Sequence, residues 1–260
     1  MRWGKKLSAV QPADDGAFVL SFADRTQVTS AVLVGADGVW SKVRSLVSDA
    51  QPRYSGMSYI DTYLEDVDVR HPETAAAVGA GSLYALEPGK GFLAHREADD
   101  RIHTYVNLDH PAEWFDQFDF TDPDATRAAI AGEFKEWSPV LRSLIADSDT
   151  DPILRAIYEL PDEHRWDARH GVTLVGDAGH PTVPGGNGAN NAMLDGAELG
   201  LAIAHNPDNV DAAIAAYEPI MFERAAKSAT EAHQDVQMIF GPGSPHRLAA
   251  VFNGEEFDGA

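Results

Sequence analysis

The chain has 260 residues, of which 44% are hydrophobic and 9% aromatic, so it can bury a sizeable core in one large domain or two smaller ones. This composition excludes an intrinsically disordered protein, which would be much poorer in aliphatic and aromatic residues. The formal net charge of −21 disfavours binding to nucleic acids or anionic membranes, and the lack of cysteine excludes disulfides, thiolate metal sites and thiol nucleophiles.

The first fifty residues predict a small β-meander that ends in a polar turn. The strand-like runs Leu7–Val10, Ala17–Phe22 and Gln27–Val34 are separated by clusters of turn-forming residues. The third run continues into Gly35-Ala-Asp-Gly38, and Ser41 is expected to be the N-cap of a short helix that ends at Val47.

The middle of the chain predicts one antiparallel sheet followed by helices. Tyr54–Asp66 is rich in β-prone residues, and Ser82–Leu108 contains strand-like runs separated by Pro-Gly and Asp-Asp turns. We expect the sheet to extend from Tyr54 to Leu108 and to pack away from the loop that carries Asp177. Ala125–Trp137 has apolar residues near helical spacing, Pro139 opens another short helix, and Ile153–Leu160 predicts a further strand.

The stretch VGDAGHPTVPGGNGAN, Val175–Asn190, is too rich in glycine, proline and asparagine for a core helix or strand. It follows the apolar run Gly171–Val175 and precedes a helical pattern, Ala192–Ala204. The rest of the chain is predicted to be helical, with breaks at Asn206-Pro207 and at Gly241–Gly243. A strand that leads through glycines to a helix N-terminus presents free N–H groups and a partial positive charge, so this stretch predicts a site for an electron-rich ligand.

No targeting or membrane-spanning segment is recognisable in the sequence. No apolar run approaches the ~18 residues of a membrane span. The N-terminal segment MRWGKKLSAVQPADDG lacks the apolar core of a secretory signal. We therefore expect a soluble, cytoplasmic protein that binds neither membranes nor nucleic acids, and the sequence leaves its oligomeric state open.

Two motifs together carry a family resemblance, although either alone would be a common strand–turn unit. VLVGADGVWSKVR, Val32–Arg44, resembles the Asp-Gly motif of the single-component FAD-dependent aromatic hydroxylases. GVTLVGDAGHPTVPGGNGANNAMLDGAELGLAIA, Gly171–Ala204, resembles the Gly-Asp motif and the following helix of the same family. The helical tail, Tyr217–Phe252, is similar to that of the tetracycline-inactivating branch.

The resemblance implies a cofactor site but identifies no catalytic residue. Asp177 would accept a hydrogen bond from the FAD ribityl chain, Pro184 would lie beside the isoalloxazine ring, and Gly186–Asn190 would donate backbone N–H groups to its pyrimidine edge. Asp37 would bear on both FAD and NADPH binding, and an orienting role is favoured for His180 over proton transfer. The implied cofactor-binding residues are Asp37, Gly38, Arg44, Gly176, Asp177, Pro184, Gly186, Asn187, Gly188, Ala189 and Asn190.

The implied fold is α/β (α+β), with an FAD/NAD(P)-binding Rossmann-like domain, an antiparallel-sheet substrate domain and C-terminal helices. The FAD-binding domain would comprise residues 1–50 and 161–205, the substrate domain 51–160, and the helices 206–260. The family opens with a strand–GxGxxG–helix unit that is not found in these 260 residues. We therefore expect a truncated or split monooxygenase that is inactive alone and is completed by another segment or chain.

The substrate is expected on the predicted sheet, as its pocket floor opposite the flavin, and no metal is expected. Aromatic, histidine and arginine side chains of the sheet suit a planar, polyoxygenated molecule, and the candidates are Phe92, His95, Arg96, His103 and Tyr105. The ten histidines include no His-x3-His or His-Glu-x2-His pattern, which argues against a metal site.

The resemblance implies a monooxygenase that uses FAD and NADPH, although NADH remains an alternative reductant. Reduced FAD and O2 would form a flavin C4a-hydroperoxide, which transfers one oxygen atom to an aromatic or enol small molecule. Two other functions remain open. One is a non-catalytic remnant or binding module of the same fold, and the other is a flavoprotein reductase or dehydrogenase.

Overall fold

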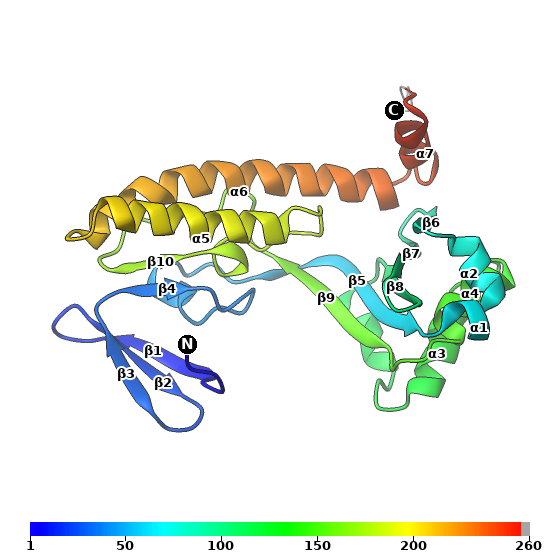
Figure 1. The fold of residues 1–260 in the computed structure, drawn as a ribbon, viewed down its shortest axis with the longest axis horizontal. Coiled ribbons are helices and arrows are strands. Elements are labelled where there is room, and N and C mark those ends of the chain that lie inside the picture. The colour runs from blue at the N-terminus through cyan, green and yellow to red at the C-terminus, as the bar shows by residue number, and fades with distance from the viewer. Residues whose placement is uncertain (256–260) are drawn as a thin grey trace. The chain divides into compact units, whose positions relative to one another are not determined.

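The computed structural model describes residues 1–255 and divides into two compact units (Figure 1). The first unit comprises Met1–Arg53 and Tyr158–Gln234. The second unit comprises Tyr54–Ile157 and the segment that begins at Asp235. Each unit has its own apolar core, so each is described separately.

The first unit begins with the predicted antiparallel meander. Strands β1 (Leu7–Pro12), β2 (Phe18–Phe22) and β3 (Gln27–Ser30) form one sheet in that order. The prediction of a single third strand from Gln27 to Val34 is wrong, because the meander ends at Ser30. A separate strand, β4 (Leu33–Gly35), follows and leaves the meander to join another sheet.

Strand β4 pairs in parallel with β10 (Val172–Leu174), which brings the two sequence motifs side by side. The register pairs Val172 with Leu33 and Leu174 with Gly35. A Cβ at Gly35 would lie 2.6 Å from a methyl carbon of Leu174, so this close approach requires glycine. Val34, which is 38% exposed, leaves an apolar side chain on the surface of this two-stranded sheet.

Two long helices complete the first unit. Helix α5 (Gly188–His205) and the N-terminal part of α6 (Val210–Phe240) lie side by side (Figure 1), joined by a hydrogen bond of 2.8 Å from Asn191 to Ser228. Two 3₁₀ turns, η1 (Arg44–Leu46) and η3 (Gly176–Ala178), follow the strands β4 and β10. The predicted helix up to Val47 is therefore only a three-residue turn, although Ser41 Oγ does accept the Arg44 N–H at 3.0 Å, as a cap would.

The second unit contains a five-stranded sheet in the order β6-β7-β8-β5-β9. Its strands are β5 (Arg53–Leu64), β6 (Ser82–Glu87), β7 (Lys90–Glu97), β8 (Arg101–Leu108) and β9 (Ile153–Glu159). The antiparallel pairing of β5 through β8 confirms the predicted sheet. Two helices that were not predicted, α1 (Val67–Arg70) and α2 (Pro72–Val78), interrupt it, because Pro72 at the first helical position is followed by an alanine run.

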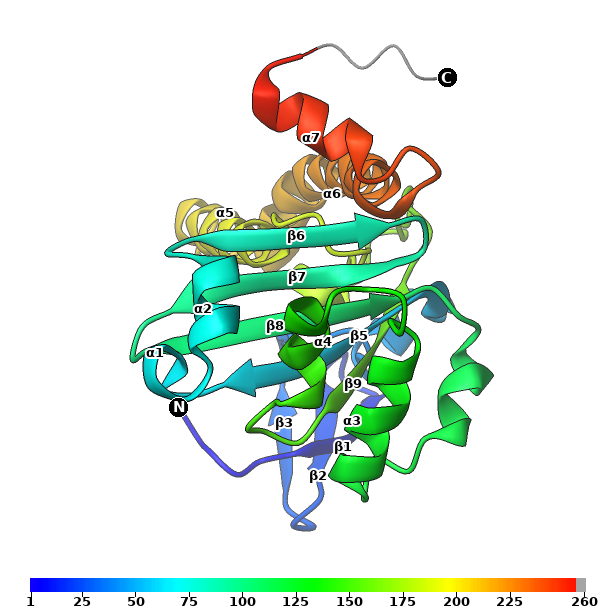
Figure 2. The same ribbon diagram turned by 90° about the vertical axis from the view of Figure 1, so that its right-hand side faces the viewer.

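Helices cover one face of this sheet and form the core of the unit with it. Figure 2 shows α2, α3 (Pro123–Gly132) and α4 (Pro139–Ala146) across that face, and the 3₁₀ segment η2 (Ala112–Gln117) precedes them. Helix α3 ends before the predicted Trp137, although Trp137 still packs on the core with its ring centroid 5.4 Å from that of Phe92. A last helix, α7 (His246–Asn253), follows α6. Within residues 1–255, none of the helices has the length and apolarity that crossing a membrane would need.

Candidate cofactor site

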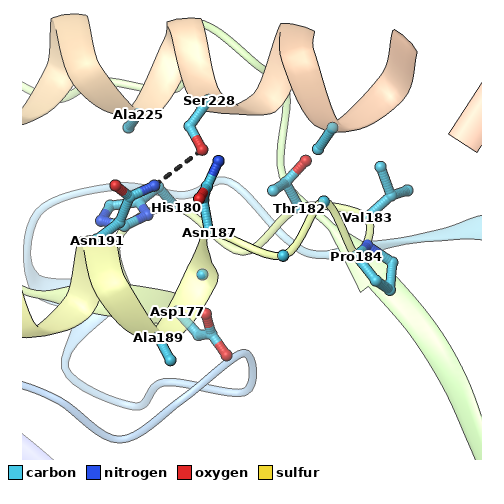
Figure 3. A pocket seen from close by; sticks show the side chains of 14 residues that line it. Asp177, His180, Thr182, Val183, Pro184, Asn187, Ala189, Asn191, Ala225 and Ser228 are labelled. Atoms are coloured by element: carbon cyan, nitrogen blue, oxygen red, sulfur yellow. Dashed lines mark hydrogen bonds between the residues drawn. The ribbon is translucent and has the colours of Figure 1, made fainter. Parts of the chain in front are cut away.

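The glycine-rich loop between β10 and α5 surrounds a pocket of about 330 Å³ in the first unit (Figure 3). Its walls come from the 3₁₀ turn after β10, from the loop itself, from the first turn of α5 and from one side of α6. The lining residues are Asp177, His180, Thr182–Ala189, Asn191, Ala225, Ser228 and Ala232. The predicted residues Pro184 and Gly186–Ala189 therefore lie together on this pocket, whereas Asn190 belongs to α5 but does not line it.

The N-terminus of α5 presents unused backbone donors to this pocket. The first backbone hydrogen bond of the helix runs from the Asn191 N–H to the carbonyl of Asn187, at 2.9 Å. The N–H groups of Gly188, Ala189 and Asn190 precede it and have no partner within the helix. The side chain of Asn187 at the N-cap makes no capping hydrogen bond. Together with the helix dipole, these amides favour an electron-rich ligand.

Asp177 supplies a free acceptor next to these donors. Its side chain is exposed, and in the part of the chain that the structure describes its carboxylate makes no hydrogen bond or ion pair. Asp177 also borders a second hollow of about 440 Å³, which it shares with Ala36, Gly38 and Ala189. The Asp-Gly and Gly-Asp turns thus meet at one surface. The free carboxylate of Asp177 on this surface can accept a hydrogen bond from a ligand hydroxyl.

Arg44 joins the two motifs. Its Nε donates to the carbonyl of Ala178 at 2.8 Å, and its Nη2 donates to the carbonyl of Asp177 at 3.0 Å. The side chain is almost fully buried, and this burial lowers the pKa of Arg44, partly offset by the charge of Asp37. The resemblance implies that Arg44 is a cofactor-binding residue, and the structure shows that its guanidinium fixes the backbone of the Gly-Asp turn.

The carboxylate of Asp37 is already engaged in its own turn. One oxygen accepts the hydroxyl of Ser41 at 2.6 Å, and the other accepts the backbone N–H of Lys42 at 2.8 Å. Asp37 thereby shapes the turn that presents Gly38, at a φ of 80°, to the second hollow.

A buried carboxylate on α5 holds the glycine-rich loop in place. The sequence had not indicated a role for this residue. Asp195 of α5 is fully buried and accepts hydrogen bonds from the Gly176 N–H at 2.7 Å, from His180 Nε2 at 2.6 Å and from Arg224 of α6 at 2.7 Å. His180 is thereby held with its ring on a carboxylate, which fits the orienting role favoured for it. The signal in the sequence is weak, since Asp195 is one of two acidic residues in a helix that is mostly apolar from Ala192 to Ala204.

The surroundings of Asp195 keep its carboxyl group ionised. Burial by itself would raise the pKa of Asp195, but the hydrogen bonds from His180, the Gly176 amide and Arg224 outweigh that effect and lower it. The strand end, the loop and both long helices are therefore tied to one negative charge. The position of the glycine-rich loop therefore depends on Asp195, which is buried in the core of the first unit.

Gly185 fits the pocket wall only because it lacks a side chain. A Cβ at this position would lie 2.5 Å from the Cβ of Ala232 and 2.7 Å from its Cα. Gly185→Ala should therefore push the loop away from α6 and lower the free energy of unfolding by about 1–3 kcal/mol. Urea denaturation followed by circular dichroism measures this change.

Gly188→Ala is the matched control for Gly185→Ala. A Cβ at Gly188 would meet no atom within 4 Å, and the backbone there is helical. We expect its free energy of unfolding to stay within about 0.5 kcal/mol of the parent value. Equal stability of the two variants would contradict the close approach of Gly185 to α6.

The predicted substrate residues of the second unit divide between the two faces of its sheet. His95, His103 and Tyr105 lie together, with the His103 ring centroid 5.1 Å from that of His95 and 4.3 Å from that of Tyr105. Phe92 is fully buried on the helix-covered face against Phe134, so it is a core residue and does not share a surface with the histidines. It was selected for its aromatic ring, and the alternation of the strand places it on the other side.

Arg96 also points away from the histidine face. Its guanidinium forms ion pairs with Asp68, at 2.7 Å, and with Asp100. Asp68 lies in α1 and Asp100 in the turn between β7 and β8, so the guanidinium of Arg96 is engaged at the end of the sheet. Of the five candidates, the structure therefore brings together three.

Comparisons with known proteins find relatives along most of the chain. A family model described as FAD binding domain matches residues 1–232. An FAD-dependent urate hydroxylase of Mycolicibacterium vanbaalenii is 30% identical over 233 residues, which cover 87% of this chain and 55% of that protein. Monooxygenase penA of Penicillium thymicola is 28% identical, over 88% of this chain and 65% of its own length. The chain thus spans between about half and two thirds of these relatives.

Solved structures show the same fold. HpxO of Klebsiella pneumoniae, in complex with FAD and uric acid, has a TM-score of 0.75 at 24% identity, over 96% of this chain and 62% of that one. The tetracycline destructase Tet(51) has a TM-score of 0.68 at 14% identity, over 96% of this chain and 64% of that one. These neighbours confirm the predicted fold class.

Proposed function

We propose, from the premise that this chain belongs to the FAD-binding domain family, that it forms part of an FAD-dependent monooxygenase using NAD(P)H and O2. Family membership is shown by the match over residues 1–232. The activity is our inference from the pocket geometry and from the relatives. The observation that carries it is the unpaired carboxylate of Asp177 beside Gly188 and Ala189, whose backbone amides have no partner within α5, in the part of the chain that the structure describes.

The residues of the pocket fit the flavin end of FAD. The exposed Asp177 carboxylate can accept a hydrogen bond from a ribityl hydroxyl, and the amides at the start of α5 can donate to the pyrimidine edge. Pro184 is exposed on the pocket wall, where a flat ring can lie against it. When bound, FAD supplies the oxygen chemistry, and the positive end of α5 favours the charge of its reduced form.

These residues account for only one end of FAD. The adenosine and pyrophosphate of a dinucleotide are usually held by a strand–GxGxxG–helix unit, which the 260 residues do not contain. We infer that a further segment or a second chain supplies this unit. Arg44 would keep the two turns in place for it, because its hydrogen bonds link them already.

For the substrate we propose a planar aromatic or enol small molecule with several oxygen atoms. The urate hydroxylases among the relatives and the uric acid complex of HpxO are consistent with such a molecule. On the second unit, His95 and Tyr105 are partly exposed beside the buried His103, and their rings can stack on a planar molecule and donate to its oxygens.

Asp177→Ala tests the assignment of the pocket. In the chain extended by a GxGxxG unit from a relative, we expect FAD to bind ten- to a hundredfold more weakly, because a charged hydrogen bond is worth ~1.5–3 kcal/mol. The quenching of flavin fluorescence during a titration measures the dissociation constant. The fold should be unchanged, since the carboxylate has no partner in the described part of the protein.

Asp208→Ala is the control for this experiment. Asp208 is an exposed carboxylate in the turn between α5 and α6, and it does not line either hollow. Its replacement removes the same charge from the same unit without touching the pocket. If both variants bound FAD as tightly as the parent, the pocket would not be the flavin site.

A further inference from the structure

The second unit places two histidines and a glutamate around one point. His95 and Glu97 are two positions apart on β7, so their side chains leave the same face of the strand. His103 on β8 is the direct cross-strand neighbour of His95. One possible ligand atom from each of the three side chains lies within 4.8 Å of the other two.

The distances between these atoms are those of ligands around one ion. Glu97 Oε1 lies 3.2 Å from His95 Nε2 and 3.2 Å from His103 Nδ1. Ligands at ~2.0–2.1 Å from a tetrahedral zinc ion are separated from one another by about 3.3 Å. The side chains of His95 and Glu97 are partly exposed. A small rotation of either side chain can therefore bring its ligand atom to bonding distance from an ion shared with His103.

The orientation of His103 is fixed from behind by a second carboxylate. His103 Nε2 contacts the carboxylate of Asp61, which can only accept a hydrogen bond when ionised, so this nitrogen carries the proton. The opposite nitrogen, Nδ1, then directs its lone pair toward Glu97. Metal-binding histidines usually donate their other N–H to a carboxylate in this way.

The ring of His103 is also held rigidly on both sides. Its side chain is 8% exposed. It stacks on Tyr63 with ring centroids 4.1 Å apart and planes at 13°, and the Tyr105 ring lies 4.3 Å away. Asp61 is in turn held by Arg155 at 3.2 Å. A rigid ligand with a fixed proton favours metal binding, because little ordering remains to be done.

We propose that His95, Glu97 and His103 form a binding site for a divalent transition-metal ion, with Asp61 as the residue that orients His103. Two imidazoles and one carboxylate suit Zn²⁺, and they disfavour Mg²⁺, which prefers oxygen ligands. The exposed side of the site, between His95 and Glu97, leaves a coordination position for water or an anionic oxygen. The proposal departs from the prediction of no metal, which considered spacings for ligands on one helix, whereas these three residues meet across two strands.

The alternative is a hydrogen-bond network without metal, in which a doubly protonated His103 donates to Asp61 and Glu97 at once.

Titration calorimetry of the EDTA-treated, untagged chain with ZnCl2 distinguishes the metal site from the network without metal. We expect one tight equivalent of zinc and no comparable binding of MgCl2. His95→Asn and Glu97→Gln, which alter partly exposed side chains, should each weaken that equivalent at least tenfold. Asp61→Asn should weaken it 10- to 100-fold.

His233→Asn is the matched control. His233 also contacts two carboxylates, at 3.2 Å from Glu159 and 3.1 Å from Asp162, but it offers only one imidazole. Its replacement should leave the tight equivalent unchanged. Absence of a tight equivalent in the parent, or its persistence at full affinity in both His95→Asn and Glu97→Gln, would overturn the proposal. Thermal unfolding of each variant without metal shows whether the fold is preserved.

Discussion

Asp195→Asn is expected to lower the free energy of unfolding by about 3 kcal/mol at neutral pH, the low end of the ~3–5 kcal/mol for breaking a buried ion pair. The carboxylate is fully buried and accepts from Gly176, His180 and Arg224. An asparagine keeps the shape but turns an amide donor toward groups that are themselves donors. The expected loss of stability is at the low end of this range because Arg224 keeps its ion pair with Glu198, at 2.8 Å.

Glu198→Gln is the control, since it removes the other partner of the same arginine. The Glu198 side chain is 30% exposed, so its loss should cost less than about 1 kcal/mol. Urea denaturation at neutral pH measures both variants. Equal losses would show that the buried hydrogen bonds of Asp195 contribute nothing beyond an ordinary surface ion pair.

The effect of Asp195 should depend on pH in a defined direction. The folded protein lowers the pKa of Asp195, so its ionised form contributes stability above the unfolded value of ~3.9. That contribution is lost as the pH falls through the lower, folded pKa. The difference in stability between the parent and Asp195→Asn should therefore be largest near neutrality and should shrink below about pH 4. A difference that grows on acidification would contradict the assigned charge state.

Local patterns predicted the elements well where the chain obeys a single period. The meander, the hairpins with Pro88-Gly89 and Asp99-Asp100 at their turns, and the helix that opens at Pro139 follow from alternation and turn chemistry. The break between Ser30 and Leu33 did not follow, because β4 is formed by pairing with β10, far along the chain. Partners at such distances leave no mark on local periodicity.

The candidate cofactor site shows the same limit at the level of side chains. Asp177 and the glycines could be selected from the sequence because they follow a strand and precede a helix. The bridge from Arg44 to the second turn depends on the β4–β10 pairing, and the role of Asp195 depends on its burial between α5 and α6. Alternation along β7 already separates Phe92 from His95, and the packing of Phe92 on Phe134 then shows which of the two faces the helices cover.

Titration of the purified 260-residue chain with FAD is expected to give a dissociation constant in the high-micromolar range or weaker. The pocket can hold the ribityl and isoalloxazine end, but the chain has no GxGxxG unit for the pyrophosphate. Several hydrogen bonds worth ~1.5–3 kcal/mol each are then absent, which corresponds to several decades of affinity. We also expect no NADPH oxidation above background from this chain alone.

Adding a strand–GxGxxG–helix segment from a relative, fused or in trans, should restore sub-micromolar FAD binding and NADPH consumption. The same segment with its glycines replaced by valine is the control, because side chains there block the approach of the phosphates. Sub-micromolar binding with flavin reduction by the 260-residue chain alone would contradict the division of the site.

Riboflavin shows which end of FAD these residues hold. It shares the ribityl and isoalloxazine groups with FAD but has neither phosphate nor adenosine. If the pocket around Asp177 binds only the flavin end, the 260-residue chain should bind riboflavin and FAD with dissociation constants of the same order. The extended chain should instead prefer FAD by several decades, since only then do the phosphates meet the helix N-terminus that favours them. A strong preference for FAD by the unextended chain would place the pyrophosphate site within these residues, and the second hollow, beside Gly38 and Ala189, would then be the region to test.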